Sequence, residues 1–213
     1  MKKFCIMAAT AIFVASFVGC GKDEEKGSSI PTSPLTNNEL SGILIGKSWF
    51  DVSKCTTIKV FVRLADDGGK VVIAEAPLTN AAFSVTLPEP PAEVLKTMEA
   101  AISRGISLSN KNVKYTTADI SATVDINDDD EKSNATASFI YSKKKDATTT
   151  YEEYYYVDSD VVIAGAVAIN ENKTATLSMN LKKGWNVVTT IDGETSIEQK
   201  TGTRAEGLAW AMW

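Results

Sequence analysis

Apolar and polar residues alternate with a period of two along most of the chain beyond residue 40. In the clearest run, 58–64, four aliphatic side chains alternate with Lys59, Phe61 and Arg63. Successive side chains of a β-strand point to opposite faces, so this pattern predicts strands with one buried face. We expect strands at 58–64, 71–74, 83–87, 120–126, 135–143, 151–157, 161–169, 175–181 and 185–191.

Residues that favour turns separate these runs. The segments 66–69 and 192–193 contain Asp-Gly, and 170–173 and 182–184 are polar and close with Lys or Gly. Such residues tolerate the backbone of a hairpin turn, and their spacing is typical of a sandwich or barrel. We therefore predict an all-β fold, an antiparallel β-sandwich.

One segment departs from this alternation. After Pro90 and Pro91, apolar residues recur at helical spacing, and Gly105 follows as a C-cap. We expect one short helix near 92–104, covering an open edge or end of the sheets. The helix and the polar loop 106–117 could divide two small β-units. We favour one domain over 39–213, because 40–88 offers only about four strands.

The first residues have the features of a signal peptide. Lys2 and Lys3 precede an apolar run, 4–18, which ends at Gly19 and Cys20. A helix of about fifteen residues spans roughly 22 Å, less than the ~30 Å hydrocarbon core of a bilayer. The run therefore indicates a signal peptide rather than a permanent transmembrane helix.

The end of this run, 17–20 (Phe-Val-Gly-Cys), resembles the lipobox of bacterial lipoproteins. The resemblance implies that 1–19 is removed and that Cys20, whose thiolate is the nucleophile, carries the lipid, typically palmitate, as the mature N-terminus. Phe17 stands where Leu is usual. The alternative is an ordinary secretory signal followed by a chance cysteine.

The segment 20–38 is polar and contains Pro31 and Pro34, which predicts a flexible linker behind the lipidated cysteine. Lys22, Asp23 and Glu24 resemble the surface-export signal of Bacteroidota lipoproteins. That resemblance implies an outer-membrane protein facing the cell exterior, with the membrane as partner through its lipid. Alternatively, these charges only solvate the linker.

Two stretches of the body also resemble uncharacterised Bacteroidota surface lipoproteins. They are 57–88, with its strand, Asp-Gly turn and second strand, and 177–186 (Leu-Ser-Met-Asn-Leu-Lys-Lys-Gly-Trp-Asn). The resemblance implies a Greek-key or transthyretin-like sandwich. It carries no catalytic residues.

Composition excludes several chemistries. The 213 residues include no histidine, which excludes Ser-His-Asp and Cys-His catalysis and His-ligated metals. The net charge of −5, without a basic stretch, argues against nucleic acid. Once Cys5 is removed and Cys20 lipidated, Cys55 has no partner for a disulfide, and we expect a small buried residue there. We expect no cofactor.

Two groups of residues are candidate sites. Asp125, Asn127 and Asp129 alternate like the first ligands of a calcium loop, although a solvated hairpin tip is the alternative. Tyr154 and Tyr156 share one face of their strand. The two tyrosines, together with Trp210 and Trp213, could form an exposed platform for stacking sugars, although aromatic residues also fill β cores.

These observations favour a lipid-anchored cell-envelope protein that binds a ligand or has a structural role, and not an enzyme. A carbohydrate-binding component of a nutrient-uptake system is one alternative, with a glycan or an envelope protein as partner. A carboxylate-dependent glycan hydrolase is another. It would require a cleft with at least two convergent acids.

The anchor and the export signal are separable by mutation. We expect Cys20→Ala to abolish acylation, because the thiol that takes the lipid is removed. Two or more acyl chains, at about 0.8 kcal/mol per buried methylene, are what hold such a protein in a leaflet. Changing Lys22, Asp23 and Glu24 to Ala should keep lipidation but leave the protein on the inner face of the outer membrane. Protease shaving of whole cells should digest the wild type and spare the triple variant. Equal digestion of both would refute the export signal.

Overall fold

The structure, a computed structural model, describes residues 34–47, 50–64, 69–98, 105–128, 131–202 and 205–212, and only the backbone of 124–128 and 131–135. Its regular elements are strands and three 3-10 turns, so the predicted all-β class is confirmed. The turns are Thr36–Asn38, Val52–Lys54 and Ala92–Val94. The strands are β1 (Glu39–Ile45), β2 (Cys55–Arg63), β3 (Lys70–Pro77), β4 (Ala82–Thr86), β5 (Lys96–Thr97), β6 (Ile106–Leu108), β7 (Lys114–Asp128), β8 (Glu131–Lys145), β9 (Thr148–Val157), β10 (Val161–Asn170), β11 (Lys173–Leu181), β12 (Gly184–Asp192), β13 (Ser196–Lys200) and β14 (Ala209–Met212).

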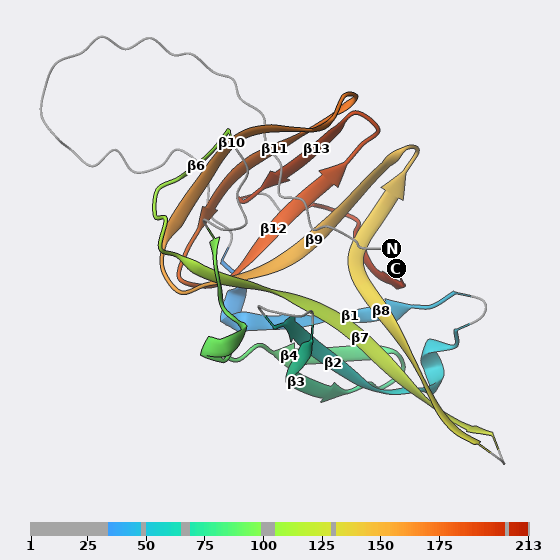
Figure 1. The fold of residues 1–213 in the computed structure, drawn as a ribbon. Coiled ribbons are helices and arrows are strands. Elements are labelled where there is room, and N and C mark those ends of the chain that lie inside the picture. The colour runs from blue at the N-terminus through green and yellow to red at the C-terminus, as the bar shows by residue number, and fades with distance from the viewer. Residues whose placement is uncertain are drawn as a thin grey trace, which may run out of the picture.

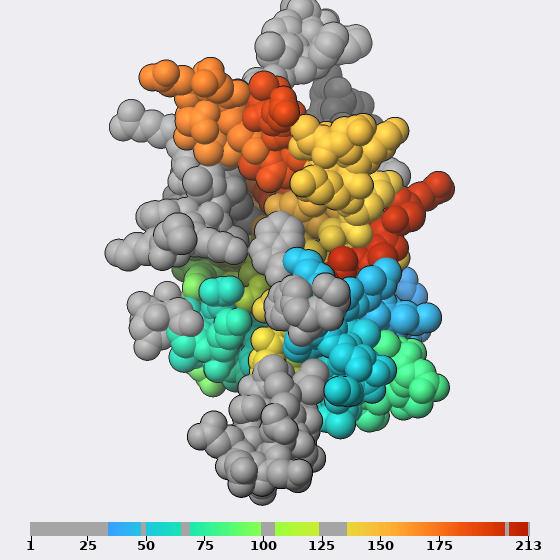
Figure 2. All heavy atoms as spheres, turned by 90° about the vertical axis from the view of Figure 1, so that its right-hand side faces the viewer, coloured from blue at the N-terminus to red at the C-terminus, as the bar shows by residue number. Residues whose placement is uncertain are grey.

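All fourteen strands belong to one mixed sheet. Its main path runs β4-β1-β14-β8-β7-β9-β12-β13-β11-β10-β6, and β2, β3 and β5 join through β7. The expected antiparallel pairing holds except in two ladders, β1–β14 and β11–β13, which are parallel. Figure 1 shows an upper, curved part made of β6 and β9 to β13 and a lower part with β1 to β4. The strands β7 and β8 link the two parts. In Figure 2, the tips of the β8–β9, β10–β11 and β12–β13 hairpins lie above the N-terminal strands.

Two hydrophobic clusters lie on opposite faces of β9 and β12. Tyr154 and Trp185 are buried in the first cluster, whereas Tyr155 and Val188 are buried in the second. The first also takes in β1 to β4 and parts of β7, β8 and β14, so it does not follow the order of the chain. Within the described residues, one continuous sheet thus carries two hydrophobic cores. The two cores do not correspond to two consecutive segments of the sequence, because both include residues of β9 and β12.

The predicted helix near 92–104 is absent from the part of that segment that the structure describes. A single 3-10 turn, Ala92–Val94, is followed by β5, whose Lys96 pairs with Tyr115. Val94 is buried in the first cluster and Met98 in the second. A helix would place these side chains, four residues apart, on the same face. Residues 99–104 lie outside the described residues.

The last residues of the predicted linker are packed against the body. Pro34 forms a β-bridge with Asn186, and the Leu35 amide donates to the Trp185 carbonyl at 2.9 Å. Leu35 is buried in the first cluster. The linker predicted for 20–38 therefore ends before Pro34.

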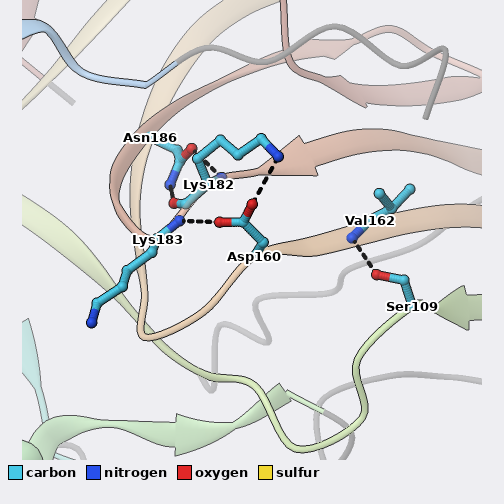
Figure 3. Close-up of polar contacts among 6 residues, drawn as sticks. All are labelled: Ser109, Asp160, Val162, Lys182, Lys183 and Asn186. Carbon is cyan, nitrogen blue, oxygen red and sulfur yellow. Dashed lines mark hydrogen bonds and ion pairs between the residues drawn. The ribbon is translucent and has the colours of Figure 1, made fainter. Parts of the chain in front are cut away.

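The motif at 177–186 forms the β11–β12 hairpin, whose turn is held by Asn186 (Figure 3). Asn186 is fully buried, and its side-chain Nδ2 donates to the backbone carbonyls of Lys182 and Gly184 at 2.7 and 2.9 Å. Its Oδ1 accepts from the backbone N–H of Lys182 at 2.9 Å. Asp160 accepts from the Lys182 ammonium at 2.8 Å and the Lys183 amide at 2.9 Å, which ties the turn before β10 to this hairpin. The motif thus has a structural role here.

Replacing Asn186 tests this role. Asn186→Ala removes the partners of three backbone groups, and we expect it to lower the free energy of unfolding by about 1–3 kcal/mol. The exposed Asn172→Ala is the matched control and should change it by no more than about 0.5 kcal/mol. Urea unfolding of the purified variants measures both. Equal effects of the two variants would contradict this role.

Candidate functional site

Three strands pair with one another in a closed triangle. β7 pairs with β9 from Tyr115↔Val157 to Ala118↔Tyr154. Its later part pairs with β8 from Ile120↔Phe139 onward. β8 in turn pairs with β9 from Tyr141↔Glu152 onward. The three ladders stop around Asp119, Ile140 and Glu153, and these strands bound a triangular junction in Figure 1. We call it the β7–β8–β9 junction.

A cavity of about 480 Å³ lies at this junction. Its wall contains residues of all three strands, before and after the positions where the ladders stop. The rest of the wall comes from Arg63 of β2, Lys70 of β3, Lys96 of β5 and Trp210 of β14. A volume in this range suits a small-molecule ligand. The residues from the three junction strands are Tyr115, Thr116, Thr117, Ala118, Asp119, Ile120, Ser138, Phe139, Ile140, Tyr141, Tyr151, Glu152, Glu153, Tyr154 and Tyr155.

Aromatic rings form much of the wall. On one face of the junction, Tyr115 stacks on Tyr155, with ring centroids 6.3 Å apart and planes 14° apart. On the other face, Trp210 packs against Tyr141 at 5.2 Å and Tyr154 at 6.0 Å. The backbone at Gly42 approaches Trp210 so closely that a Cβ there would lie 2.4 Å from its ring. Glycine at this position therefore allows the indole to pack there.

Charged side chains gather on the Tyr115 face. Arg63 donates to one oxygen of Asp119 through two nitrogens, at 3.0 and 2.8 Å. The Lys70 ammonium lies 5.3 Å from the centre of the Phe61 ring, a cation–π contact. Lys96 pairs in register with Tyr115 and therefore lies on the same face.

Glu153 connects this cavity to β12 and β13. One oxygen, Oε2, accepts from Thr190 Oγ1 at 2.6 Å and from Gln199 Nε2 at 2.9 Å. Burial raises the pKa of the Glu153 carboxyl above its ordinary value; the two hydrogen bonds oppose that rise, and the charge of Asp119 adds to it. Asp119 would face Glu153 if the β7–β9 ladder continued by one pair. The junction thus places two acids at the point where the ladder opens.

The predicted aromatic platform is not exposed. Tyr154, Tyr156 and Trp210 retain 3–4% of their accessible surface, because they pack in the first hydrophobic cluster. Tyr154 and Trp210 nevertheless line the cavity from within. Tyr156 lies elsewhere and donates to Glu89 at 2.7 Å; burial and this bond raise its pKa to about 12. Trp213 lies outside the described residues.

The other predicted site residues, apart from Cys55, lie where the structure describes no side chains. Asp125 and Asn127 lie in β7 paired with Asn134 and Lys132, but their side chains are not described, and Asp129 lies outside the described residues. Cys20, Lys22, Asp23 and Glu24 also lie outside them. Cys55 is confirmed as a buried residue at the start of β2, and burial raises its pKa.

Sequence reasoning missed the charged residues of the cavity, above all Asp119 and Glu153. One signal was present: Glu152 and Glu153 interrupt a strand that is otherwise rich in tyrosine and buried at its end. Acidic residues are rarely buried without a specific partner, so their presence there indicated an unusual environment.

Neither protein-family models, curated proteins nor solved structures gave a match to this chain. Within the described ranges, no helix is long and apolar enough to cross a membrane. Among the same residues, no group of three or more acidic or cysteine side chains is arranged to hold a metal ion.

The position of Glu153 makes stability depend on pH. Its raised pKa means that the folded chain binds this proton more tightly than the unfolded chain, so its contribution is greatest below the ordinary glutamate pKa and is lost as pH rises toward the raised value. Glu153→Gln keeps an acceptor for Thr190 and Gln199 and cannot ionise. We expect its urea midpoint to exceed that of the wild type at pH 8 and to approach it at pH 4.

The exposed Glu194→Gln is the control, and its small effect should not vary in this way. A difference between Glu153→Gln and the wild type that is constant over this pH range would show that Glu153 titrates normally.

Proposed function

We propose that this chain is a lipid-anchored cell-envelope protein that binds a carbohydrate in the cavity at the β7–β8–β9 junction. The observation that carries the proposal is the composition of the wall, in which stacked tyrosines alternate with carboxylates, hydroxyls and cations. Aromatic faces pack on the apolar side of a sugar ring, while charged and hydroxyl groups bind its hydroxyls. The aromatic contribution thus comes from inside the sheet junction rather than from an exposed platform.

The anchoring part of the proposal rests on the sequence. Cys20 would carry the lipid, and Lys22, Asp23 and Glu24 would direct the protein to the outer face of the outer membrane. The chain joins the body at Pro34, beside the β11–β12 turn. A segment of roughly a dozen polar residues would then separate the lipid from the binding domain and leave the cavity open to ligands outside the cell.

A purely structural role is the first alternative. It is supported by the burial of Trp185 and Trp210, which fits a protein whose large aromatic residues only build the core. The cavity favours binding instead, because a concave site of this volume with both aromatic and polar groups in its wall is typical of a ligand pocket.

A glycan hydrolase acting through carboxylates is the second alternative. It is favoured by one observation: the cavity places Asp119, which is paired with Arg63, near Glu153, whose pKa is raised. Two carboxyl groups in different environments are what a general acid and its partner require. Reducing-end analysis of any bound oligosaccharide after incubation separates the two functions, since a binding protein returns it intact.

Filling the cavity tests the binding proposal. Ser138 lies on β8 at the cavity wall and is exposed, so Ser138→Trp should obstruct the cavity without removing a core contact. Thr136→Trp is the matched control, because Thr136 is exposed on the same face of β8, two residues from Ser138, and does not line the cavity. Against a panel of immobilised oligosaccharides, we expect Ser138→Trp to lose about tenfold or more in affinity and Thr136→Trp to bind as the wild type does.

Wild-type protein that binds no member of the panel would contradict the proposal. Equal binding by both tryptophan variants would also contradict it, because the ligand would then lie elsewhere.

A further inference from the structure

We propose that the cavity selects an acidic sugar, one whose pyranose ring carries a carboxylate, and that Lys70 and Lys96 bind that carboxylate. This inference rests on the proposed carbohydrate-binding function and names the class of ligand. It follows from the charges on the Tyr115 face of the junction, taken one at a time.

Asp119 is already compensated. Both hydrogen bonds from Arg63 reach the same oxygen, Oδ2, and the two side chains pair in a partly exposed setting at the edge of the cavity. Each charge of this pair therefore has a partner before a ligand arrives. Neither is available to repel or attract a ligand as an isolated charge would.

The two glutamates lie on opposite faces of β9, and only Glu153 is on the Tyr115 face. Glu152 and Glu153 are neighbours on a strand, so their side chains point to opposite faces, and Glu152 is buried on the Trp210 side. Glu153 shares the face of Tyr115, where Thr190 and Gln199 donate to its Oε2, no cation pairs with it among the described residues, and burial raises its pKa.

Lys70 and Lys96 are cations of this face that have no acidic partner among the described residues. Lys70 pairs in register with Arg63, and Lys96 with Tyr115, so both approach the cavity on the face that holds the stacked tyrosines. Among the described residues, the Lys70 ammonium makes a cation–π contact with the Phe61 ring, and neither Lys70 nor Lys96 forms an ion pair or a side-chain hydrogen bond. The described part of this face thus holds two cations that no carboxylate pairs with, although the whole chain carries −5.

This arrangement matches a sugar acid in each of its parts. The pyranose ring can lie against Tyr115 and Tyr151, and its hydroxyls can bond with Glu153 and Thr117, which line the same cavity. A carboxylate on the ring would then meet the two ammonium groups at the mouth. A neutral sugar would leave both lysines without an anionic partner, and an amino sugar would be repelled by them.

The experiment compares matched pairs of probes that differ only in the carboxylate. Isothermal titration of the full-length protein with galacturonate and glucuronate disaccharides, and with the corresponding neutral galactose and glucose disaccharides, should give at least about tenfold tighter binding of the acidic member of one pair. Lys70→Gln combined with Lys96→Gln should remove that preference, so that the acidic and the neutral member of the pair bind with equal affinity. Lys59→Gln is the matched control. Lys59 lies on the same face of β2 as Arg63, is paired with Glu75 at 3.1 Å and does not line the cavity.

Two results would overturn the inference and leave the proposed function standing: equal affinity for the acidic and neutral disaccharides, or a preference that survives the double substitution. If no disaccharide of either kind binds and the wider oligosaccharide panel is also negative, the proposed function fails with it. A preference that Lys59→Gln removes as strongly as the double variant would show a general effect of surface charge and would also overturn the inference.

Discussion

The strands β7, β8 and β9 each divide one edge between two partners, and the rest of the structure depends on that division. Backbone amides and carbonyls along a strand edge need partners wherever they are buried, and one edge cannot pair with two strands at the same residues. β7 therefore pairs first with β9 and then with β8, each of which completes the triangle with the other. The ladders stop around Asp119, Ile140 and Glu153, and a cavity lies where they stop.

The position of the site follows from this geometry. β2 and β3 continue the sheet on the other edge of β7 and bring Arg63 and Lys70 to the junction, while β5 brings Lys96. On β9, the two hydrophobic clusters lie on opposite faces, and their packing holds Tyr154 and Tyr155 in the cavity wall. The residues of the proposed binding site thus lie on packed strands rather than on loops, which favours a preformed site.

Much of the fold could be predicted from the sequence, since alternation locates the strands from β2 to β4 and from β7 to β12. β1, β5, β6, β13 and β14 were missed, β5 inside the expected helix and β6 inside the expected loop 106–117. β1 and β14 pair with each other across nearly the whole chain, which no local pattern reveals. The apolar residues Val94 and Met98 indicated a helix, but they belong to different cores. Tyr154 and Trp210 were identified as candidates and do line the cavity, whereas Asp119 and Glu153 meet only through long-range pairing of β7 with β9.

We propose that this protein holds its ligand at the junction of β7, β8 and β9. Hydrogen–deuterium exchange of the full-length protein, with and without a saturating galacturonate or glucuronate disaccharide, tests it most directly. We expect slower exchange in three separate peptides, those covering 118–120, 139–141 and 152–154, with the hairpin tip at 170–173 unchanged. Protection confined to other segments, or the absence of protection in these three, would contradict it.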